Sequence, residues 1–280
     1  MVHGGELELK SCLLAASLFK NLACPHDLIG AVAYPEDTWG AMSAEGIAVL
    51  ARCGVTRTPI LNRISADYPI GNKLTALGVP SEFERVVFLD SDILLIRAFY
   101  DHPCLATGYA VKPADVETFT KNGGDWSRVY RKFHLPMPKY RVKSTHGDEH
   151  MMPYYNAGVI CCRNNSQLSA LWVDVCNRID KDQTILNKRP WLDQIGLPVA
   201  LSMLGVRPLA LTEDLNFPGH KQDVEEAKSA YFCHYHWPSV IEASPRLRTL
   251  VAGLISEHPE LLVMMNRFDE WKPVAACCTQ

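Results

Sequence analysis

The sequence predicts an α/β domain followed by a short helical tail. Segments with the patterns of strands and helices alternate along the chain, and 48% of the residues are hydrophobic. A length of 280 residues suffices for one large domain with a sizeable core. We therefore expect a single domain over residues 1–240 and a helical C-terminal tail over residues 241–280 that packs on it.

The first part of the chain is expected to open with a helix. Glu6 to Ala23 carries apolar residues at helical spacing, and Leu28 to Ala33 has the composition of a strand. Ser43 to Cys53 is predicted as a helix in which Ser43 is the N-cap and Gly54 the C-cap. Two shorter elements are expected to follow, a strand over 58–61 and a helix over 72–77.

The rest of the chain continues the alternation. Strands are expected over 105–111, 154–162, 206–211 and 231–235. Helices are expected over 126–133, 166–179, 191–204 and 245–266. The helix over 191–204 should break or bend near Pro198, and the last helix should be interrupted near Pro259. The irregular stretch 112–150 is typical of a segment that covers a site or selects a substrate.

The segment 85–95 carries the strongest chemical signal. Val86 to Leu89 is an unbroken apolar run, typical of a strand buried on both faces of a parallel sheet, and Asp90 and Asp92 follow it. On an extended backbone the two acids would point to the same side, at the strand end where open α/β sheets bind ligands. Paired carboxylates favour a hard cation such as Mg²⁺ or Mn²⁺. The alternative is an ordinary turn, which aspartate also favours.

Charge and cysteine content limit the expected partners. The net charge of −3 supplies no basic field, so we expect no nucleic-acid partner. The apolar segments are too short to span a bilayer, so we expect no integral membrane segment. Ten cysteines occur without Cys-x-x-Cys spacing, and two pairs are adjacent, Cys161-Cys162 and Cys277-Cys278. This pattern predicts reduced thiols and a cytoplasmic location.

Six short motifs occur in a recognisable order. They are Asn72-Lys73-Leu74, Leu89-Asp90-Ser91-Asp92, Tyr155-Asn156-Ala157-Gly158-Val159, Asp193-Gln194, Leu215-Asn216-Phe217 and Phe232-Cys233-His234-Tyr235. Over residues 70–240 this order resembles the GT-A-fold glycosyltransferases of the glycogenin, galactinol synthase and lipopolysaccharide galactosyltransferase kind. The resemblance implies the GT-A fold of nucleotide-diphospho-sugar transferases, a Rossmann-like mixed sheet flanked by helices.

The resemblance also implies an activity and a metal. It implies a hexosyltransferase that uses a UDP-sugar with Mn²⁺ or Mg²⁺ and retains the anomeric configuration. Asp90, Asp92 and His234 would bind the ion, which would stabilise the charge on the departing nucleoside diphosphate. His236, two residues further on, is the alternative to His234 as the third ligand.

The other site residues that the resemblance implies contact the donor. Lys73, Asp90, Ser91, Asn156, Ala157 and Gly158 would bind it. Asp193 would accept hydrogen bonds from sugar hydroxyls, and Gln194 would polarise the reacting face near the anomeric carbon. Each residue also has a structural alternative. These alternatives are a solvated surface residue for Lys73, a strand-end cap for Asn156, a packing residue for Gly158, a helix N-cap for Asp193 and a chain turn before Pro218 for Asn216.

Three features depart from this family. The chain enters a helix by Glu6, so the leading strand that helps to hold uracil and ribose is missing or very short. Pro190 stands where some relatives carry an acid. No lysine lies between Tyr235 and Pro245, where relatives often hold the diphosphate.

These departures leave alternative functions open. The main one is a catalytically weak or inactive nucleotide-sugar-binding protein of the same fold. A haloacid-dehalogenase-type phosphatase is less favoured, because no later pair of adjacent acids follows the Asp-x-Asp motif. The acceptor stays open among saccharides, lipids and proteins, and we include a homodimer among the expected partners.

Overall fold

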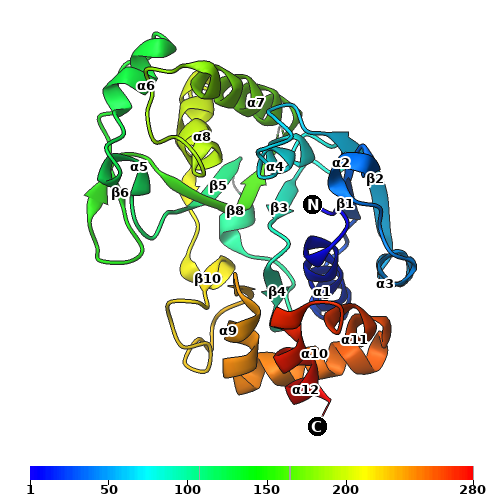
Figure 1. Ribbon diagram of the computed structural model, residues 1–280. Helices are drawn as coiled ribbons and strands as arrows, with labels where there is room; N and C mark the ends of the chain where they lie inside the picture. The colour runs from blue at the N-terminus through cyan, green and yellow to red at the C-terminus, as the bar shows by residue number, and fades with distance from the viewer. Residues whose placement is uncertain (107, 164, 280) are drawn as a thin grey trace. The chain divides into compact units, whose positions relative to one another are not determined.

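The chain divides into two units, each with its own sheets and its own hydrophobic core. The computed structural model describes residues 1–106, 108–163 and 165–279 (Figure 1). Unit 1 combines Met1–Pro59, Leu89–Asp101 and Thr212–Gln280, and unit 2 combines Ile60–Phe88 and His102–Leu211. The helical tail expected over 241–280 is part of unit 1. Each unit contains a mixed sheet and helices, so the predicted α/β class is confirmed.

Unit 1 begins with the predicted helices and strands and with one short helix over 36–39 that the sequence did not predict. They are α1 (Glu6–Asn21), β1 (Leu28–Tyr34), α2 (Glu36–Trp39), α3 (Ala44–Arg52) and β2 (Val55–Leu61). Ser43 is the N-cap of α3 as expected, because its hydroxyl accepts a hydrogen bond of 3.1 Å from the Gly46 N–H. Ahead of α1, Val2 forms one isolated parallel bridge to Val32.

A three-stranded sheet forms the part of unit 1 that positions the candidate metal ligands. Its order is β10 (Phe217–Pro218), β11 (Phe232–His234) and β4 (Ile93–Leu95). β11 is parallel to β10 and antiparallel to β4, with His234 opposite Ile93. This register places His234 beside the turn that precedes β4.

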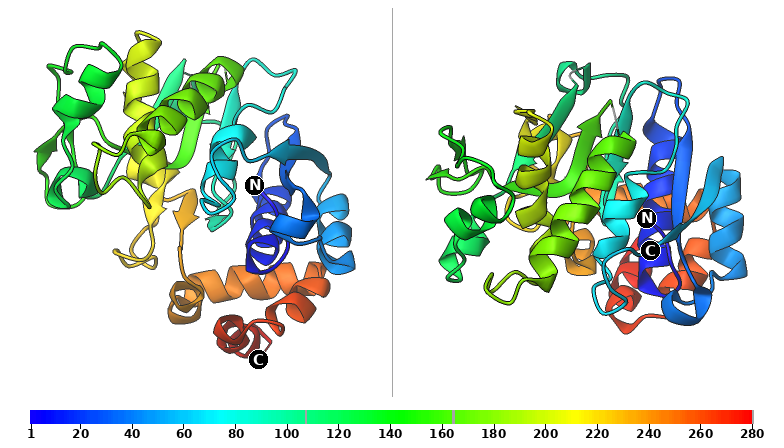
Figure 2. Two further views of the ribbon diagram at one scale, coloured as in Figure 1. Left: turned by 45° about the horizontal axis from the view of Figure 1, so that its top comes forward. Right: turned by 90° about the horizontal axis from the view of Figure 1, so that it is seen from above.

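The C-terminal helices complete the core of unit 1. They are α9 (Pro238–Ala243), α10 (Pro245–Glu257), α11 (Glu260–Met265) and α12 (Lys272–Cys278). The interruption expected near Pro259 lies between α10 and α11. Helices α10 and α11 pack against α1, and α12 packs against α10, as the orange-to-red segments of Figure 2 show. Trp271, which is fully buried, donates its indole N–H to Glu6 of α1 at 3.0 Å.

Unit 2 is built on a four-stranded sheet. The strand order is β3 (Val86–Leu89), β8 (Tyr155–Cys162), β5 (Tyr109–Pro113) and β9 (Leu209–Ala210). β5 is antiparallel to β8 and parallel to β9, so the sheet is mixed. The expectation that 86–89 is buried on both faces was wrong, because Phe88 alone of these four residues is buried. β3 lies at the edge of the sheet, where a strand has a neighbour on one side only and is less shielded.

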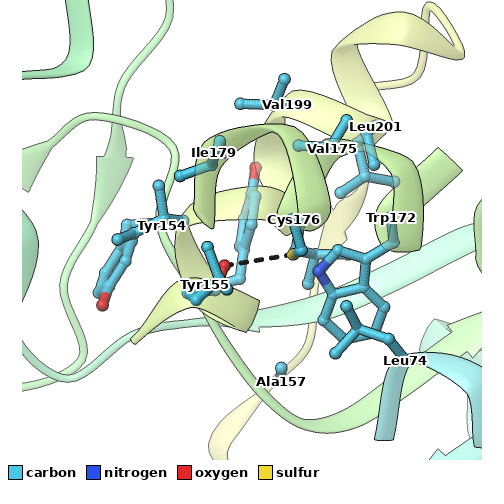
Figure 3. Packing of buried hydrophobic residues seen from close by; sticks show 14 of the residues in the cluster. Leu74, Tyr154, Tyr155, Ala157, Trp172, Val175, Cys176, Ile179, Val199 and Leu201 are labelled. Carbon is cyan, nitrogen blue, oxygen red and sulfur yellow. Dashed lines mark hydrogen bonds between the residues drawn. The ribbon is translucent and has the colours of Figure 1, made fainter. Parts of the chain in front are cut away.

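Unit 2 also contains helices. They are α4 (Gly71–Ala76), α5 (Thr118–Lys121), α6 (Trp126–Lys132), α7 (Asn165–Lys181) and α8 (Leu192–Met203). Of these helices, α8 packs on β8. A small hairpin joins β6 (Val142–Lys143) to β7 (His150–Met151) within the irregular stretch. Helix α8 continues through Pro198. Figure 3 shows how Trp172, Val175 and Cys176 of α7 pack with Val199 and Leu201 of α8 in the core of unit 2.

Two expectations about the whole chain can be compared with the structure. All ten cysteines lie in the described part of the chain and are free thiols, including the two adjacent pairs. Among the described helices, none is both long enough and apolar enough to cross a membrane.

Candidate functional site

Three side chains of unit 1 form a cluster with the ligand types of a metal centre. Asp92, His234 and His236 each offer one atom within 4.8 Å of the others, and no other such group was found among the described residues. His234 Nε2 lies 3.0 Å from Asp92 Oδ1, and His236 Nδ1 lies 3.4 Å from Asp92 Oδ2. One carboxylate thus faces two imidazoles, and each of its oxygens has its own partner.

Local backbone structure explains how these residues meet. Asp92 lies in the turn at residues 91–92 between β3 and β4, and His234 is the last residue of β11. The Tyr235 N–H donates to the Asp92 carbonyl at 3.0 Å, which continues the β11–β4 pairing past His234. The cluster is therefore a consequence of strand register.

His236 adopts a backbone conformation that is uncommon for a residue with a side chain. Its φ is 59°, and the Trp237 N–H donates to the Tyr235 carbonyl across it at 2.6 Å. A three-residue turn with positive φ at its centre is rare and strained. The turn places the His236 ring against that of His234, with centroids 3.8 Å apart and planes 27° apart. Strain of this kind is concentrated at functional sites.

The cluster keeps Asp92 ionised. Burial alone would raise the pKa of the Asp92 carboxyl, but the charge and hydrogen bond of His234, and then those of His236, hold it well below its usual value. Burial lowers the pKa of the His236 imidazole, although its hydrogen bond to Asp92 and the charge of Asp90 act in the opposite direction. At neutral pH the cluster therefore offers an anionic carboxylate beside a histidine that favours its neutral form.

The expected partnership of Asp90 and Asp92 does not take the predicted form. Asp90 lies outside the cluster, although its charge acts on His236. The prediction assumed an extended backbone, whereas residues 91–92 form a turn, so the two acids do not follow strand alternation. Ser91, which the resemblance implied as a donor contact, is buried and donates its hydroxyl to the Met1 carbonyl at 2.7 Å.

A second polar cluster lies in unit 2 around Asp193. Lys73 Nζ is 3.5 Å from Asp193 Oδ2, and the Tyr68 hydroxyl is 3.2 Å from Asp193 Oδ1. The Asp193 N–H donates to the same hydroxyl at 3.2 Å, and the Pro190 carbonyl lies 2.9 Å from it. Burial, followed by the charge of Asp193, raises the pKa of Tyr68, so the phenol stays protonated.

This geometry decides between alternatives that the sequence left open. Asp193 is not an N-cap, because Trp191 holds that position and Asp193 lies in the first turn of α8. Lys73 is not a solvated lysine, because its side chain is 12% exposed and contacts a carboxylate that is 4% exposed. Gln194 follows Asp193 in the same turn and is half-buried.

Asn156, Ala157 and Gly158 lie at an irregularity of β8. Opposite β5, the register passes from Val111–Ile160 directly to Lys112–Asn156, so residues 157–159 form a bulge. The Asn156 side-chain oxygen accepts a hydrogen bond of 2.8 Å from the Gly158 N–H, which is a contact within the bulge. Bulges of this kind redirect side chains at binding sites.

Sequence reasoning missed two residues of these clusters. Tyr68 lies 125 residues from Asp193 and belongs to no motif. Asn216 belongs to the motif Leu215-Asn216-Phe217 but was interpreted only as a turn residue. Its side-chain oxygen lies 3.1 Å from His234 Nδ1. The motif therefore marked Asn216 as a residue of interest, but its contact with His234 was not predicted.

Comparison with solved structures identifies the fold. The chain is similar to the WbbM bifunctional glycosyltransferase in its apo form, with 14% identity and a TM-score of 0.51 over 93% of this chain and 50% of that one. The chain therefore spans half the length of that protein. It is also similar to apo mouse xyloside xylosyltransferase 1, with 13% identity and a TM-score of 0.44 over 82% of this chain and 92% of that one. The similarity to WbbM confirms the fold, the mixed α/β arrangement of GT-A glycosyltransferases.

The family follows from the sequence itself. Residues 1–205 match the Rhodobacterales glycosyltransferase domain, and the chain belongs to that family. The match includes Lys73, Asp92 and Asp193, while the two histidines lie beyond it. A search of curated proteins found no match.

Proposed function

We propose that this chain is a metal-dependent glycosyltransferase that moves a hexose from a UDP-sugar donor to an acceptor with retention at the anomeric carbon. The observation that carries this proposal is the cluster of Asp92, His234 and His236 in a chain of a glycosyltransferase family. A saccharide, lipid or protein acceptor, a homodimer and a cytoplasmic location stay predictions.

The residues of the cluster fit a divalent cation. A carboxylate oxygen and two imidazole nitrogens are ligands that transition ions accept, whereas Mg²⁺ prefers oxygen alone. The low pKa of Asp92 keeps the carboxylate charged and ready to coordinate. This donor set favours Mn²⁺ over Mg²⁺. When bound, the ion would act as a Lewis acid for the departing nucleoside diphosphate.

The cluster in unit 2 supports a role in holding the sugar. Lys73 and Tyr68 fix the Asp193 carboxylate from two directions, and a fixed carboxylate is a specific acceptor for sugar hydroxyls. The Lys73 ammonium would also offset phosphate charge. We propose Asp193 and Gln194 as catalytic residues, and Lys73, Asp90, Ser91, Asn156, Ala157 and Gly158 as donor contacts.

Family membership argues against the phosphatase alternative. A phosphatase of the haloacid-dehalogenase type would use the first acid of Asp-x-Asp as its nucleophile. Here the chain belongs to a glycosyltransferase family, and the second acid, Asp92, is the one that joins the histidines. The alternative of an inactive sugar-nucleotide-binding protein is distinguished from an active transferase by measuring donor turnover.

A donor panel tests the proposal. Purified protein is incubated with UDP-, GDP- and ADP-hexoses, and nucleoside diphosphate release is measured with Mn²⁺, with Mg²⁺ and with a chelator. We expect release from a UDP-hexose with Mn²⁺, its loss with the chelator and its recovery when Mn²⁺ is restored. His236→Ala should lower release strongly, and the matched control His150→Ala, at an exposed position of β7, should not. Binding of UDP without turnover of any donor would favour the inactive alternative, and turnover that the chelator leaves unchanged would contradict metal dependence.

A further inference from the structure

We infer that Asn216 is a positioning residue that sets the tautomer of His234. Its side-chain oxygen accepts a hydrogen bond from Nδ1–H, so the proton that His234 gives up to an incoming ion is the one on Nε2, which donates to Asp92 Oδ1 when no ion is bound. This inference rests on the proposed function, because it gives Nε2 the role of a metal ligand.

The two nitrogens of His234 face different partners. Nδ1 lies 3.1 Å from Asn216 Oδ1, and Nε2 lies 3.0 Å from Asp92 Oδ1. Asp92 belongs to the cation cluster, so Nε2 is the nitrogen on the ligand side. Nδ1 is on the side away from it, where Asn216 lies.

A neutral imidazole has one N–H and one lone pair. If Nε2 is to donate its lone pair to an ion, the proton must be on Nδ1 and needs an acceptor there. Histidine ligands of metals are commonly fixed in this way by the partner of their second nitrogen. Asn216 Oδ1 is at the distance and on the side that this role requires.

Burial makes the contact energetically important. His234 is 3% exposed and Asn216 is 1% exposed, so bulk water does not replace a lost partner at either residue. A buried polar atom left without a partner is destabilising. The pair should therefore hold the ring in one orientation.

The turn at Asn216 does not depend on the Asn216 side chain. The Asn216 N–H donates to the Glu213 carbonyl at 3.0 Å and closes the turn through the backbone. Phe217 and Pro218 then pair with Cys233 and His234 in parallel register, which brings residue 216 alongside the end of β11. The turn uses the backbone of Asn216, and its side chain contacts His234.

If the Asn216 carboxamide were turned over, the proton of the His234 ring would be expected on the other nitrogen. If the amide nitrogen faced Nδ1, it would donate to that nitrogen, the ring proton would lie on Nε2, and no lone pair would face the cation site. Asn216→Asp separates the two orientations, because aspartate has the same shape and can only accept.

The first experiment measures Mn²⁺ affinity by isothermal titration calorimetry. Asn216→Leu should weaken Mn²⁺ binding about 10- to 100-fold, the range found when a partner of a metal-binding histidine is removed. Asn216→Asp should bind at least as tightly as wild type. Asn266→Leu, at an exposed position, is the matched control and should bind like wild type. Equal affinity of wild type and Asn216→Leu, or a loss in Asn216→Asp as large as that in Asn216→Leu, would overturn the inference.

The second experiment needs no metal. In ¹⁵N-histidine-labelled, metal-free protein, correlation spectra distinguish a protonated from an unprotonated Nδ1. We expect His234 Nδ1 to carry a proton in wild type and in Asn216→Asp, and to lose its preference for that proton in Asn216→Leu. An unprotonated Nδ1 in wild type would overturn the inference even if Mn²⁺ binds. Absence of Mn²⁺ binding in wild type would instead overturn the proposed function, and the spectra would still decide the role of Asn216.

Discussion

Asp92 in unit 1 and Asp193 in unit 2 are both shielded acids, yet their partners differ in kind. Asp92 faces two imidazoles, His234 and His236, which bind ions when neutral. Asp193 faces the ammonium of Lys73 and the phenol of Tyr68, which offer protons. The partners thus make one aspartate suited to bind a cation in unit 1 and another suited to accept hydrogen bonds in unit 2.

This difference has a thermodynamic consequence. Asp193 already has the Lys73 ammonium 3.5 Å from its carboxylate, so the unit 2 cluster pairs this charge within the protein. The unit 1 cluster holds its ionised carboxylate with two histidines, and burial lowers the pKa of one of them, His236, so an incoming ion competes there with histidine protons. Substitutions in the unit 1 cluster should therefore lower metal affinity more than stability. Substitutions in the unit 2 cluster should lower stability more than metal affinity.

The largest expected effect is that of Asp92→Asn on metal binding. The substitution removes the one anionic ligand of the cluster, and we expect Mn²⁺ affinity to fall by about 100-fold or more, because even indirect partners of ligands contribute 10- to 100-fold. Calorimetric titration with Mn²⁺ measures it. Asp193→Asn is the matched control and should keep wild-type affinity. If both variants bound Mn²⁺ equally well, the distinction between the two acids would be lost.

Lys73→Met should have a smaller effect, and on stability instead of metal binding. It leaves the Asp193 carboxylate, which is 4% exposed, without its ammonium partner. We expect the free energy of unfolding to fall by about 1–3 kcal/mol, as for a buried group that loses a charged partner. Urea unfolding measures this loss.

Lys121→Met is the control for Lys73→Met. Lys121 forms an ion pair with Glu149 in which both side chains are more than half exposed, so its loss should change stability by less than about 1 kcal/mol. Mn²⁺ affinity should stay at the wild-type value in both lysine variants. A metal-binding defect in Lys73→Met would mean that the two clusters do not act separately.

Tyr68→Phe tests the remaining support of Asp193. The phenol contacts Asp193 Oδ1, the Asp193 N–H and the Pro190 carbonyl, and its removal should cost about 1–2 kcal/mol of unfolding free energy. Tyr34→Phe, at a tyrosine that is 55% exposed, should be neutral. A double-mutant cycle of Tyr68→Phe with Asp193→Asn should show coupling between the two residues, and strict additivity would contradict the contact.

Stability should also depend on pH through a buried thiol. Burial raises the pKa of Cys53 from 9.0 to about 11, so between these values the folded state keeps a proton that the unfolded state has released. The free energy of unfolding should therefore fall with rising pH in this interval, by at most about 1.4 kcal/mol per pH unit for this group. Unfolding of wild type and Cys53→Ala at pH 8, 9 and 10 isolates the contribution. Identical slopes in the two proteins would refute it.

Local signals in the sequence predicted helices and strands better than they predicted contacts between distant side chains. Periodicity and the Ser43 cap located α1 and α3, because helices are set by neighbouring residues. The alternation rule failed at Asp90 and Asp92, because the chain turns immediately after β3. Tyr68, Asp193 and Asn216 acquire their partners through packing and strand register, which one sequence does not reveal.

The division of the chain into two units was equally hidden from sequence. Each unit is assembled from segments that are far apart in the chain, with Leu89–Asp101 joining the first and last parts of unit 1. No change in composition marks these boundaries. The Asp-x-Asp motif could be found because it is local, and the family resemblance named His234 or His236 as its partner, but the pairing of β4 with β11 that brings them together was not predicted.

The most direct test of the account is anomalous X-ray diffraction from crystals of the protein soaked in Mn²⁺, collected at the manganese absorption edge. The account predicts one strong anomalous peak within bonding distance of Asp92, His234 and His236, which disappears in Asp92→Asn crystals treated in the same way. A peak bound by other residues, or no peak at saturating Mn²⁺, would contradict it.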